Sequence, residues 1–189
     1  MDEKTAEAIR NKLSSTVKKR LFEHCSGVCS EAVRMAEMFG ADKDKAYTAG
    51  LLHDCAKWMD KTRQIELCGE YGIELDDITL KCPAVIHAPL GAEVARREYG
   101  ITDEEILDAI RCHTVARTGM SLLGKIVYVA DMIEPLRDFD GVEKLRKLSK
   151  KSIDDVYREA LRQTLVFNIE KGSVVHPNTL DAWNELCGK

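Results

Sequence analysis

The sequence predicts an all-α protein that folds as one helical bundle of about eight to ten helices. Apolar residues recur at helical spacing along most of the chain, helix caps and stops separate the segments, and strand-like alternation is nowhere convincing. The 189 residues fit one domain, and 44% hydrophobic with 32% charged residues provide a core and exclude disorder for most of the chain. No internal repeat or low-complexity linker interrupts the chain, so a solenoid is disfavoured.

The expected helices follow from the spacing of apolar residues and from the residues that cap them. Gly40 ends one helix, Thr102 with Glu105 forms a capping box for another, and Ser121 caps a third. The segment 71–88 contains Gly and Pro residues and is expected to be a loop with short turns. Helices are predicted over residues 3–14, 16–39, 43–57, 60–70, 90–99, 103–113, 122–134, 141–149, 153–170 and 178–187. We expect an N-terminal helix within residues 1–15 and a helical domain over residues 16–189. The helix is expected to pack onto that domain, so that the two form one compact unit.

Composition limits the location and the partners of the protein. No apolar run approaches the ~20 residues of a membrane span, and the first residues lack the apolar core of a signal peptide. We therefore expect a cytoplasmic protein with no membrane partner. The 28 Lys and Arg against 32 Asp and Glu give a net charge of −4, which disfavours general nucleic-acid binding. The chain has seven cysteines, an odd number, and contains no CxxC motif. We therefore expect reduced thiols that are mostly buried.

Two acidic residues in apolar helical segments point to a metal site. His53 and Asp54 stand in AGLLHDCAK, and Asp131 stands in KIVYVADMIEP. Burying an ionised carboxylate without a partner costs several kcal/mol. Carboxylate oxygen and neutral imidazole nitrogen suit iron, manganese and zinc. Because neighbouring residues on a helix diverge by ~100°, His53 and Asp54 need further ligands from other segments. The candidate metal ligands are His24, His53, Asp54, His87, His113 and Asp131.

Each candidate ligand has an ordinary structural explanation when it is taken alone. His24 could be a half-exposed helix residue, His87 a loop residue bonded to backbone, and His113 a cation at a helix C-terminus. Asp131 could bond to a nearby Arg such as Arg137. The joint pattern is stronger, because one metal site explains both buried carboxylates.

The order of these ligands resembles that of the HD-domain superfamily of metal-dependent phosphohydrolases. The segments AGLLHDCAK, IHAPLGA, AIRCHTVARTGMSLLGKIVYVADMIEPLR and VVHPNTL resemble the symmetrical diadenosine-tetraphosphate hydrolases of the YqeK-like branch. The resemblance extends over about residues 16–183. It implies an HD-type helical fold, bound iron, and cleavage of diadenosine tetraphosphate into two ADP by a metal-activated water.

The resemblance also implies a role for individual residues. His24, His53, Asp54 and Asp131 would hold one ion, and Asp54 would bridge to a second ion held by His87 and His113. With one ion alone, His87 and His113 would contact phosphate instead, and manganese or another divalent metal could replace iron. Asp54, His87, Lys57 and Arg137 are the residues expected to act in catalysis. The residues expected to bind substrate are Lys57, His87, His113, Thr114, Arg117, Arg137, Val174, Val175, His176, Pro177, Asn178 and Thr179.

The chain departs from the family pattern in two places. Leu21 occupies the position three residues before the first His where the family often has Arg, with Arg20 one step earlier. Ala116 stands where Gly is common.

The two cations expected to bind phosphate have simpler explanations as well: Lys57 could stabilise a helix C-terminus, and Arg137 could pair with a neighbouring aspartate in solvent.

Three other functions are left open by the sequence. The same ligands would serve a phosphodiesterase or nucleotidase acting on another nucleotide. A nucleotide-binding regulatory protein with little turnover would keep them too. A thiol redox sensor would need exposed thiols of low pKa. A homodimer is compatible with the sequence but has no argument in it.

Overall fold

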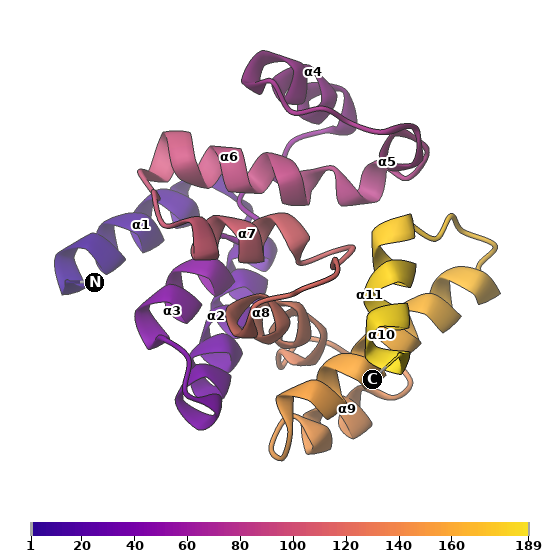
Figure 1. Ribbon diagram of the computed structural model, residues 1–189. Helices are drawn as coiled ribbons and strands as arrows, with labels where there is room; N and C mark the ends of the chain where they lie inside the picture. Colours follow the sequence, from indigo (N-terminus) through magenta and orange to yellow (C-terminus); the bar gives the residue numbers. More distant parts are fainter. Residues whose placement is uncertain (1, 189) are drawn as a thin grey trace.

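The computed structural model describes residues 2–188, which form eleven α-helices and one short 3-10 helix, with no strand in that range (Figure 1). The α-helices are α1 (Glu3–Thr16), α2 (Lys19–Phe39), α3 (Lys43–Leu52), α4 (Lys61–Tyr71), α5 (Asp77–Lys81), α6 (His87–Tyr99), α7 (Glu104–Cys112), α8 (Leu122–Ile133), α9 (Val142–Leu148), α10 (Ile153–Glu170) and α11 (Pro177–Cys187). The 3-10 helix η1 spans Pro83–Val85. The predicted all-α class is confirmed.

The core lies between helices that follow one another in the chain and helices that are distant in sequence. The helix α2 packs against α3 and α8, and α7 packs against α3, α6 and α8. In Figure 1 the α4 and α5 segment lies beyond α6, and α9, α10 and α11 gather together with the start of α11 near α5. Ile9 and Leu13 of α1 are buried in the same hydrophobic core as the rest. Within residues 2–188, no helix is long and apolar enough to cross a membrane.

Several predicted helix boundaries are confirmed by the caps that the structure shows. Gly40 ends α2 in the left-handed conformation with φ of 78°, which glycine adopts at no steric cost. Asp42 caps α3, Ser121 caps α8 and Ser152 caps α10, each by accepting hydrogen bonds from backbone N–H groups of the first turn.

Other boundaries differ from the prediction. The helix expected over 43–57 ends at Leu52, and residues 53–58 form turns. The N-cap of α7 is Asp103 rather than Thr102, because the Asp103 carboxylate accepts from the N–H groups of the first turn. The segment 71–88 holds more structure than expected: α5, η1 and the first turn of α6 all begin within it. The short α5 is not predicted from the sequence, and it raises the number of α-helices in the described residues from the ten predicted to eleven.

Close contact between α2 and α3 depends on Gly50. A Cβ at this position would lie 2.9 Å from the Cα atom of Cys29 and 3.1 Å from the Cβ of Ala32. Backbone atoms of a packed helix cannot move aside cheaply, so Gly50→Ala should overpack the interface and destabilise the protein by about 1–3 kcal/mol. Urea unfolding followed by circular dichroism would measure this loss.

Gly69 of α4 provides the matched control, because a Cβ there would meet no described atom within 4 Å. Replacing a glycine in a helix interior by alanine gains up to about 1 kcal/mol from helix propensity alone. The two Gly→Ala variants should therefore change stability in opposite directions. Equal effects would contradict the close packing of α2 on α3.

Candidate active site

The six predicted ligand residues converge from five separate segments. His24 lies in α2 and Asp131 in α8, while His53 and Asp54 follow the end of α3. His87 is the first residue of α6 and His113 follows α7. His53 and Asp54 are fully buried, and His87 and His113 are almost so. The predicted convergence is present in the structure, although ligation itself stays a prediction.

His53 and Asp54 lie directly after the end of α3, and both side chains belong to the cluster. On a continued helix the two side chains would diverge by ~100°. In the structure the helix stops at Leu52, both side chains are buried, and His53 Nε2 lies 3.3 Å from Asp54 Oδ2. Neighbours in sequence thus become neighbours in one cluster.

Three of the histidines are held in the same tautomer by the backbone. The Nδ1 atoms of His53, His87 and His113 lie 2.8, 2.8 and 2.7 Å from the carbonyl oxygen three residues earlier. A carbonyl only accepts hydrogen bonds, so each Nδ1 carries the proton and donates it. In the neutral ring, each Nε2 then presents its lone pair to the cluster. This is the arrangement that metal-binding imidazoles need.

The Nε2 atoms meet in pairs. His24 Nε2 lies 3.1 Å from His53 Nε2, and His87 Nε2 lies 3.2 Å from His113 Nε2. Two lone pairs at this separation repel unless positive charge lies beside them. A metal ion supplies that charge, so the donor set fits a divalent ion chemically.

Asp54 joins the two pairs. Its Oδ2 lies 3.4 Å from His24 Nε2, and its Oδ1 lies 3.0 Å from His87 Nε2 and 3.5 Å from His113 Nε2. Oδ1 is buried and has no hydrogen bond of good geometry within the described structure. Buried carboxylate oxygens are normally satisfied, and a cation satisfies them well. One oxygen therefore faces each histidine pair, as a carboxylate bridging two ions would.

Glu134 also belongs to the site, although the sequence motifs do not point to it. Its side chain is 1% exposed, and its Oε1 lies 3.0 Å from His24 Nδ1. His24 is thereby held with Nε2 toward the cluster, 3.1 Å from Asp131 Oδ1. A carboxylate behind a ligating histidine fixes its orientation and raises its basicity. The available signal was the i, i+3 spacing of Asp131 and Glu134 at the end of an apolar helix.

The local charges favour a cation in the cluster. Burial raises the pKa of the Asp54 and Asp131 carboxyls, but the surrounding histidines outweigh it and hold both pKa values well below the usual range. Burial likewise lowers the pKa of His24, yet hydrogen bonds to Asp131 and Asp54 raise it to about 9. Burial dominates at His87 and lowers its pKa to about 4.

Two predicted phosphate-binding cations lie at the rim of the cluster. Lys57 Nζ is 2.8 Å from Asp54 Oδ2. Arg137 forms an ion pair with the Asp131 carboxylate, and its Nε donates to the Asp131 carbonyl at 2.7 Å. The pairing of Arg137 with Asp131 was one alternative in the sequence. Both side chains stay more than a third exposed, so each can also reach a ligand from solvent.

The other predicted substrate residues divide into two groups. Thr114 Oγ1 is buried without a protein partner in the described structure and lines a cleft beside the cluster. Arg117 does not line it: its Nη2 is 2.7 Å from Asp108 Oδ2 and its Nη1 donates to the Thr118 carbonyl. Its guanidinium therefore has an ordinary structural use.

The segment 174–179 packs beside the site without lining this cleft. His176 Nδ1 accepts from Asn178 N–H and so caps α11, and its Nε2 is 3.3 Å from Thr79 Oγ1. Thr179 Oγ1 donates to the Val115 carbonyl at 2.7 Å. These bonds fix the segment against α5 and against the residues that follow His113. Its predicted contact with a nucleoside stays a prediction.

Ala116 keeps the backbone shape that a glycine would take. Its φ is 58°, which makes it the one non-glycine residue with positive φ among the described residues. An L-residue pays roughly 1–2 kcal/mol for this conformation. The loop after His113 is therefore held in place by its surroundings, including the Ala116 N–H bond to the Cys112 carbonyl.

Comparison with known proteins identifies the family. Residues 21–136, which include all six candidate ligands, match the HD domain model. The chain belongs to the HD-domain family. A symmetrical bis(5'-nucleosyl)-tetraphosphatase from Halalkalibacterium halodurans is 40% identical over 181 residues, covering 94% of this chain and 96% of that one. The enzyme of the same name from Bacillus subtilis is 39% identical over 94% of this chain and 97% of its own.

A solved HD-domain structure shares the fold. The crystal structure of a predicted HD superfamily hydrolase involved in NAD metabolism, from Clostridium acetobutylicum, superposes with a TM-score of 0.93. It is 38% identical, and each chain is covered over 96% of its length. The HD fold implied by the sequence motifs is therefore confirmed.

Proposed function

We propose that this HD-domain protein is a metal-dependent hydrolase that cleaves diadenosine tetraphosphate symmetrically into two ADP. One observation carries the proposal. The Nε2 atoms of His24 and His53 face Asp54 Oδ2, and those of His87 and His113 face Asp54 Oδ1. Relatives of 39–40% identity over nearly the whole chain bear the name of this activity. Their names supply the substrate, and the cluster supplies the chemistry.

The proposed metal ligands divide between two ions. His24, His53, Asp54 and Asp131 would hold the first ion, and Asp54 with His87 and His113 would hold the second. Iron is the metal we propose, with manganese or another divalent ion as the substitute. When bound, such ions lower the pKa of water from 15.7 to about 7 and neutralise phosphate charge.

The protein residues do the positioning. Lys57 and Arg137 lie beside Asp54 and Asp131, so each can donate a hydrogen bond to a phosphate oxygen of the substrate. Such cations stabilise the charge that grows on phosphate oxygens in the transition state. Glu134 holds His24 through Nδ1. The loop Val174–Thr179 is proposed to border one nucleoside.

Location and assembly are further parts of the proposal. All seven cysteines are free thiols in the described structure, which agrees with a reducing compartment such as the cytoplasm. A small nucleotide substrate with ADP as product is proposed as the partner, and no nucleic acid or membrane. A homodimer is compatible with the exposed apolar Leu180 of α11.

Product analysis tests the proposed reaction. Protein purified without oxygen, with its metal content measured, should convert diadenosine tetraphosphate to ADP alone, because attack at an inner phosphorus leaves two phosphates on each side. Chromatography would resolve the products. AMP with ATP would contradict symmetric cleavage. Tight nucleotide binding without turnover would favour a regulatory protein, and faster cleavage of a different nucleotide would favour another phosphohydrolase.

The buried cysteines give the redox alternative no support. Five of the seven are buried, Cys82 is half-buried and Cys187 is exposed. Burial raises the pKa of the Cys29 thiol to about 12 and that of Cys112 to about 11. Reactive sensor thiols need a lowered pKa and solvent access. Hydrolysis remains the function that the cluster supports best.

A further inference from the structure

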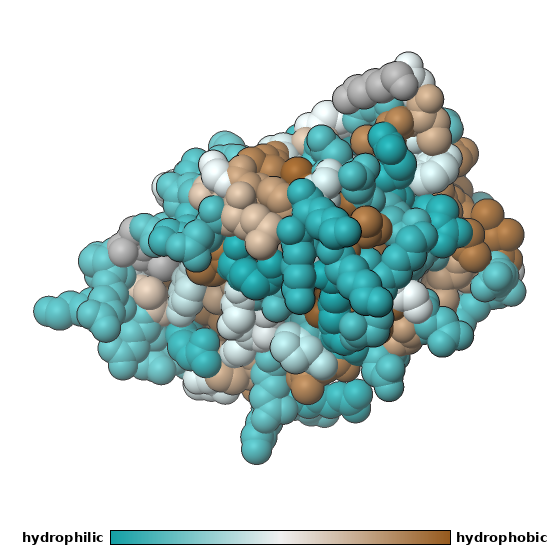
Figure 2. Space-filling view, turned by 90° about the horizontal axis from the view of Figure 1, so that it is seen from below, coloured by the Kyte–Doolittle hydropathy of each residue, from teal (hydrophilic) through white to brown (hydrophobic). Residues whose placement is uncertain are grey.

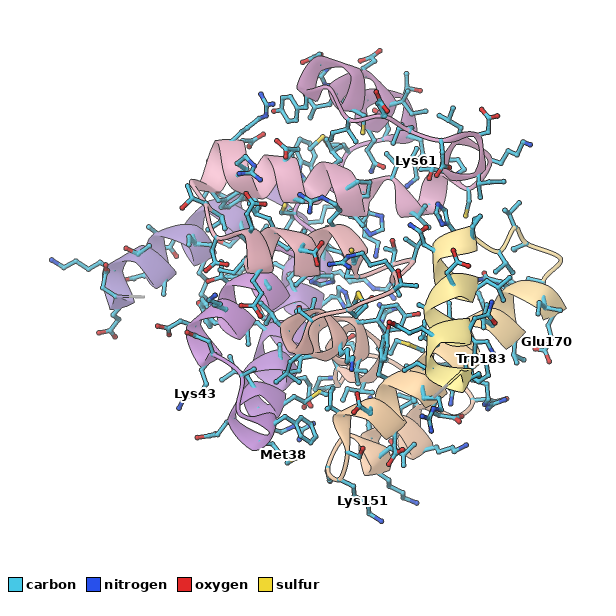
Figure 3. The ribbon with its side chains drawn as sticks, in the orientation of Figure 1. Met38, Lys43, Lys61, Lys151, Glu170 and Trp183 are labelled. Atoms are coloured by element: carbon cyan, nitrogen blue, oxygen red, sulfur yellow. The ribbon has the colours of Figure 1, made fainter. Side chains whose placement is uncertain are left out.

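A cleft of about 950 Å³ begins at the metal-ligand cluster and runs away from it between α8, α9 and α10. At one end it is lined by His113, Thr114 and Asp131. At the other it reaches Glu170, which Figure 3 labels near the outer end of α10. This volume lies at the upper end of the range for small-molecule sites. It extends well past the phosphate-binding cations at the cluster.

The cleft has aromatic and aliphatic walls that are open to solvent. Leu136, Phe139, Val166 and Phe167 all line it and are all exposed. Phe167 is 54% exposed although it is a large apolar side chain. In Figure 2, hydrophobic residues gather at the right-hand end, the side on which α10 and α11 lie in Figure 1. Exposed aromatic rings inside a hollow are platforms for the flat face of a base.

The charges of the outer cleft disfavour phosphate. Its acidic residues are Asp138, Asp140, Glu159 and Glu170. They outnumber the two cations there, which are both paired with one of them: Lys144 lies 2.9 Å and Arg162 lies 2.8 Å from carboxylate oxygens of Glu159. A neutral nucleoside is compatible with this end, because carboxylates accept hydrogen bonds from ribose hydroxyls. The phosphate chain then belongs at the metal end, beside Arg137.

Two polar oxygens on the lining residues lack protein partners. Thr114 Oγ1 lies at the metal end and Gln163 Oε1 lies on α10, and neither has a hydrogen-bond partner in the described structure. Buried polar atoms are rarely left unsatisfied. The Gln163 amide also packs under Gly141, where a Cβ would come within 2.9 Å of its Nε2. The cleft therefore offers one unpartnered hydrogen-bonding oxygen at the metal end and one on α10.

We infer that this cleft binds one of the two nucleosides of the substrate, with its base against Phe139 and Phe167. The inference rests on the proposed function, since it needs a substrate with a nucleoside at each end. Cleavage at the centre of a four-phosphate chain requires room on both sides of the metal cluster. The loop Val174–Thr179, which does not line the cleft, would then border the other nucleoside.

Phe167→Ala tests the inference. It removes an exposed ring and should leave folding intact. We expect the KM for diadenosine tetraphosphate to rise about 5- to 100-fold, the loss expected from one base–aromatic stack. The inhibition constant of inorganic tetraphosphate, which has no nucleoside, should change less than about twofold. Phe139→Ala should have the same selective effect.

The matched control is Ile169→Ala on the same helix. Ile169 is more exposed than Phe167, at 67%, and does not line the cleft, so its variant should keep the wild-type KM. An unchanged KM in both phenylalanine variants would overturn the inference while the proposed function stood. An equal loss of tetraphosphate inhibition would also overturn it, because the rings would then act on the metal end. Wild-type protein that fails to cleave the dinucleotide would instead refute the proposed function.

Discussion

Asp54→Ala should abolish both metal retention and turnover, with activity falling at least about 1,000-fold. Asp54 places one carboxylate oxygen toward each histidine pair, so one truncation removes a ligand from both proposed ions. It also leaves Lys57 without its partner at 2.8 Å. Metal analysis of the purified protein and a product assay on diadenosine tetraphosphate would measure the two losses separately.

Two further variants serve as controls for Asp54→Ala. Asp54→Asn tests the charge of the side chain, and Asp181→Ala tests the loss of a carboxylate away from the site. Asn keeps the size of the side chain and one oxygen but loses the charge, so we expect partial metal content with strongly reduced activity. Asp181 is an exposed residue of α11, and its variant should match the wild type in both measurements. Asp54→Ala protein that kept its full metal content and turnover would refute the assignment of the site.

The fold class and the residues that cluster in the candidate site could be predicted from the sequence because their signals are local. Helical periodicity, Gly40 and the caps at Asp42 and Ser121 act within one or two turns. The His53–Asp54 doublet and Asp131 stood out because carboxylates are rare in apolar helical segments. Their convergence followed from the energetic need of a buried charge for partners. These predictions required no knowledge of how the helices pack.

The end of α3 was mispredicted because nothing local marks it. Neither Gly nor Pro occurs between Leu52 and Lys57, and the segment keeps an apolar helical pattern. The helix ends where the cluster needs both His53 and Asp54 to face inward, and where Cys55 Sγ meets the Gly91 carbonyl. Tertiary contacts thus override propensity at the site itself.

Residues that act through long-range packing were also invisible in the sequence. Glu134 contacts His24 across 110 positions, and its role exists only once α8 lies against α2. The outer cleft brings Phe139 and Phe167 into one hollow, although neither residue stands in a recognisable motif. Surface aromatic residues have many ordinary explanations, so only the shape of the cleft distinguishes them.

Glu134→Gln should weaken metal binding about 10- to 100-fold, the usual cost of losing a carboxylate behind a ligating histidine. Glu134 uses both oxygens: Oε1 meets His24 Nδ1 at 3.0 Å and Oε2 accepts from Leu136 N–H at 2.8 Å. Glutamine has one acceptor oxygen and cannot serve both donors. Competition with a chelator would measure the affinity, and exposed Glu143→Gln serves as the control.

Gly27→Ala separates the orientation of Glu134 from its charge. A Cβ at position 27 would lie 2.7 Å from Glu134 Oε2, so the substitution must displace the carboxylate while leaving its charge in place. If Glu134 acts by holding His24, both variants should weaken metal binding. A loss in Glu134→Gln with normal affinity in Gly27→Ala would mean that the charge alone matters. Normal affinity in both would show that His24 keeps its orientation without this contact, and that Asp131 and Asp54 alone fix its Nε2.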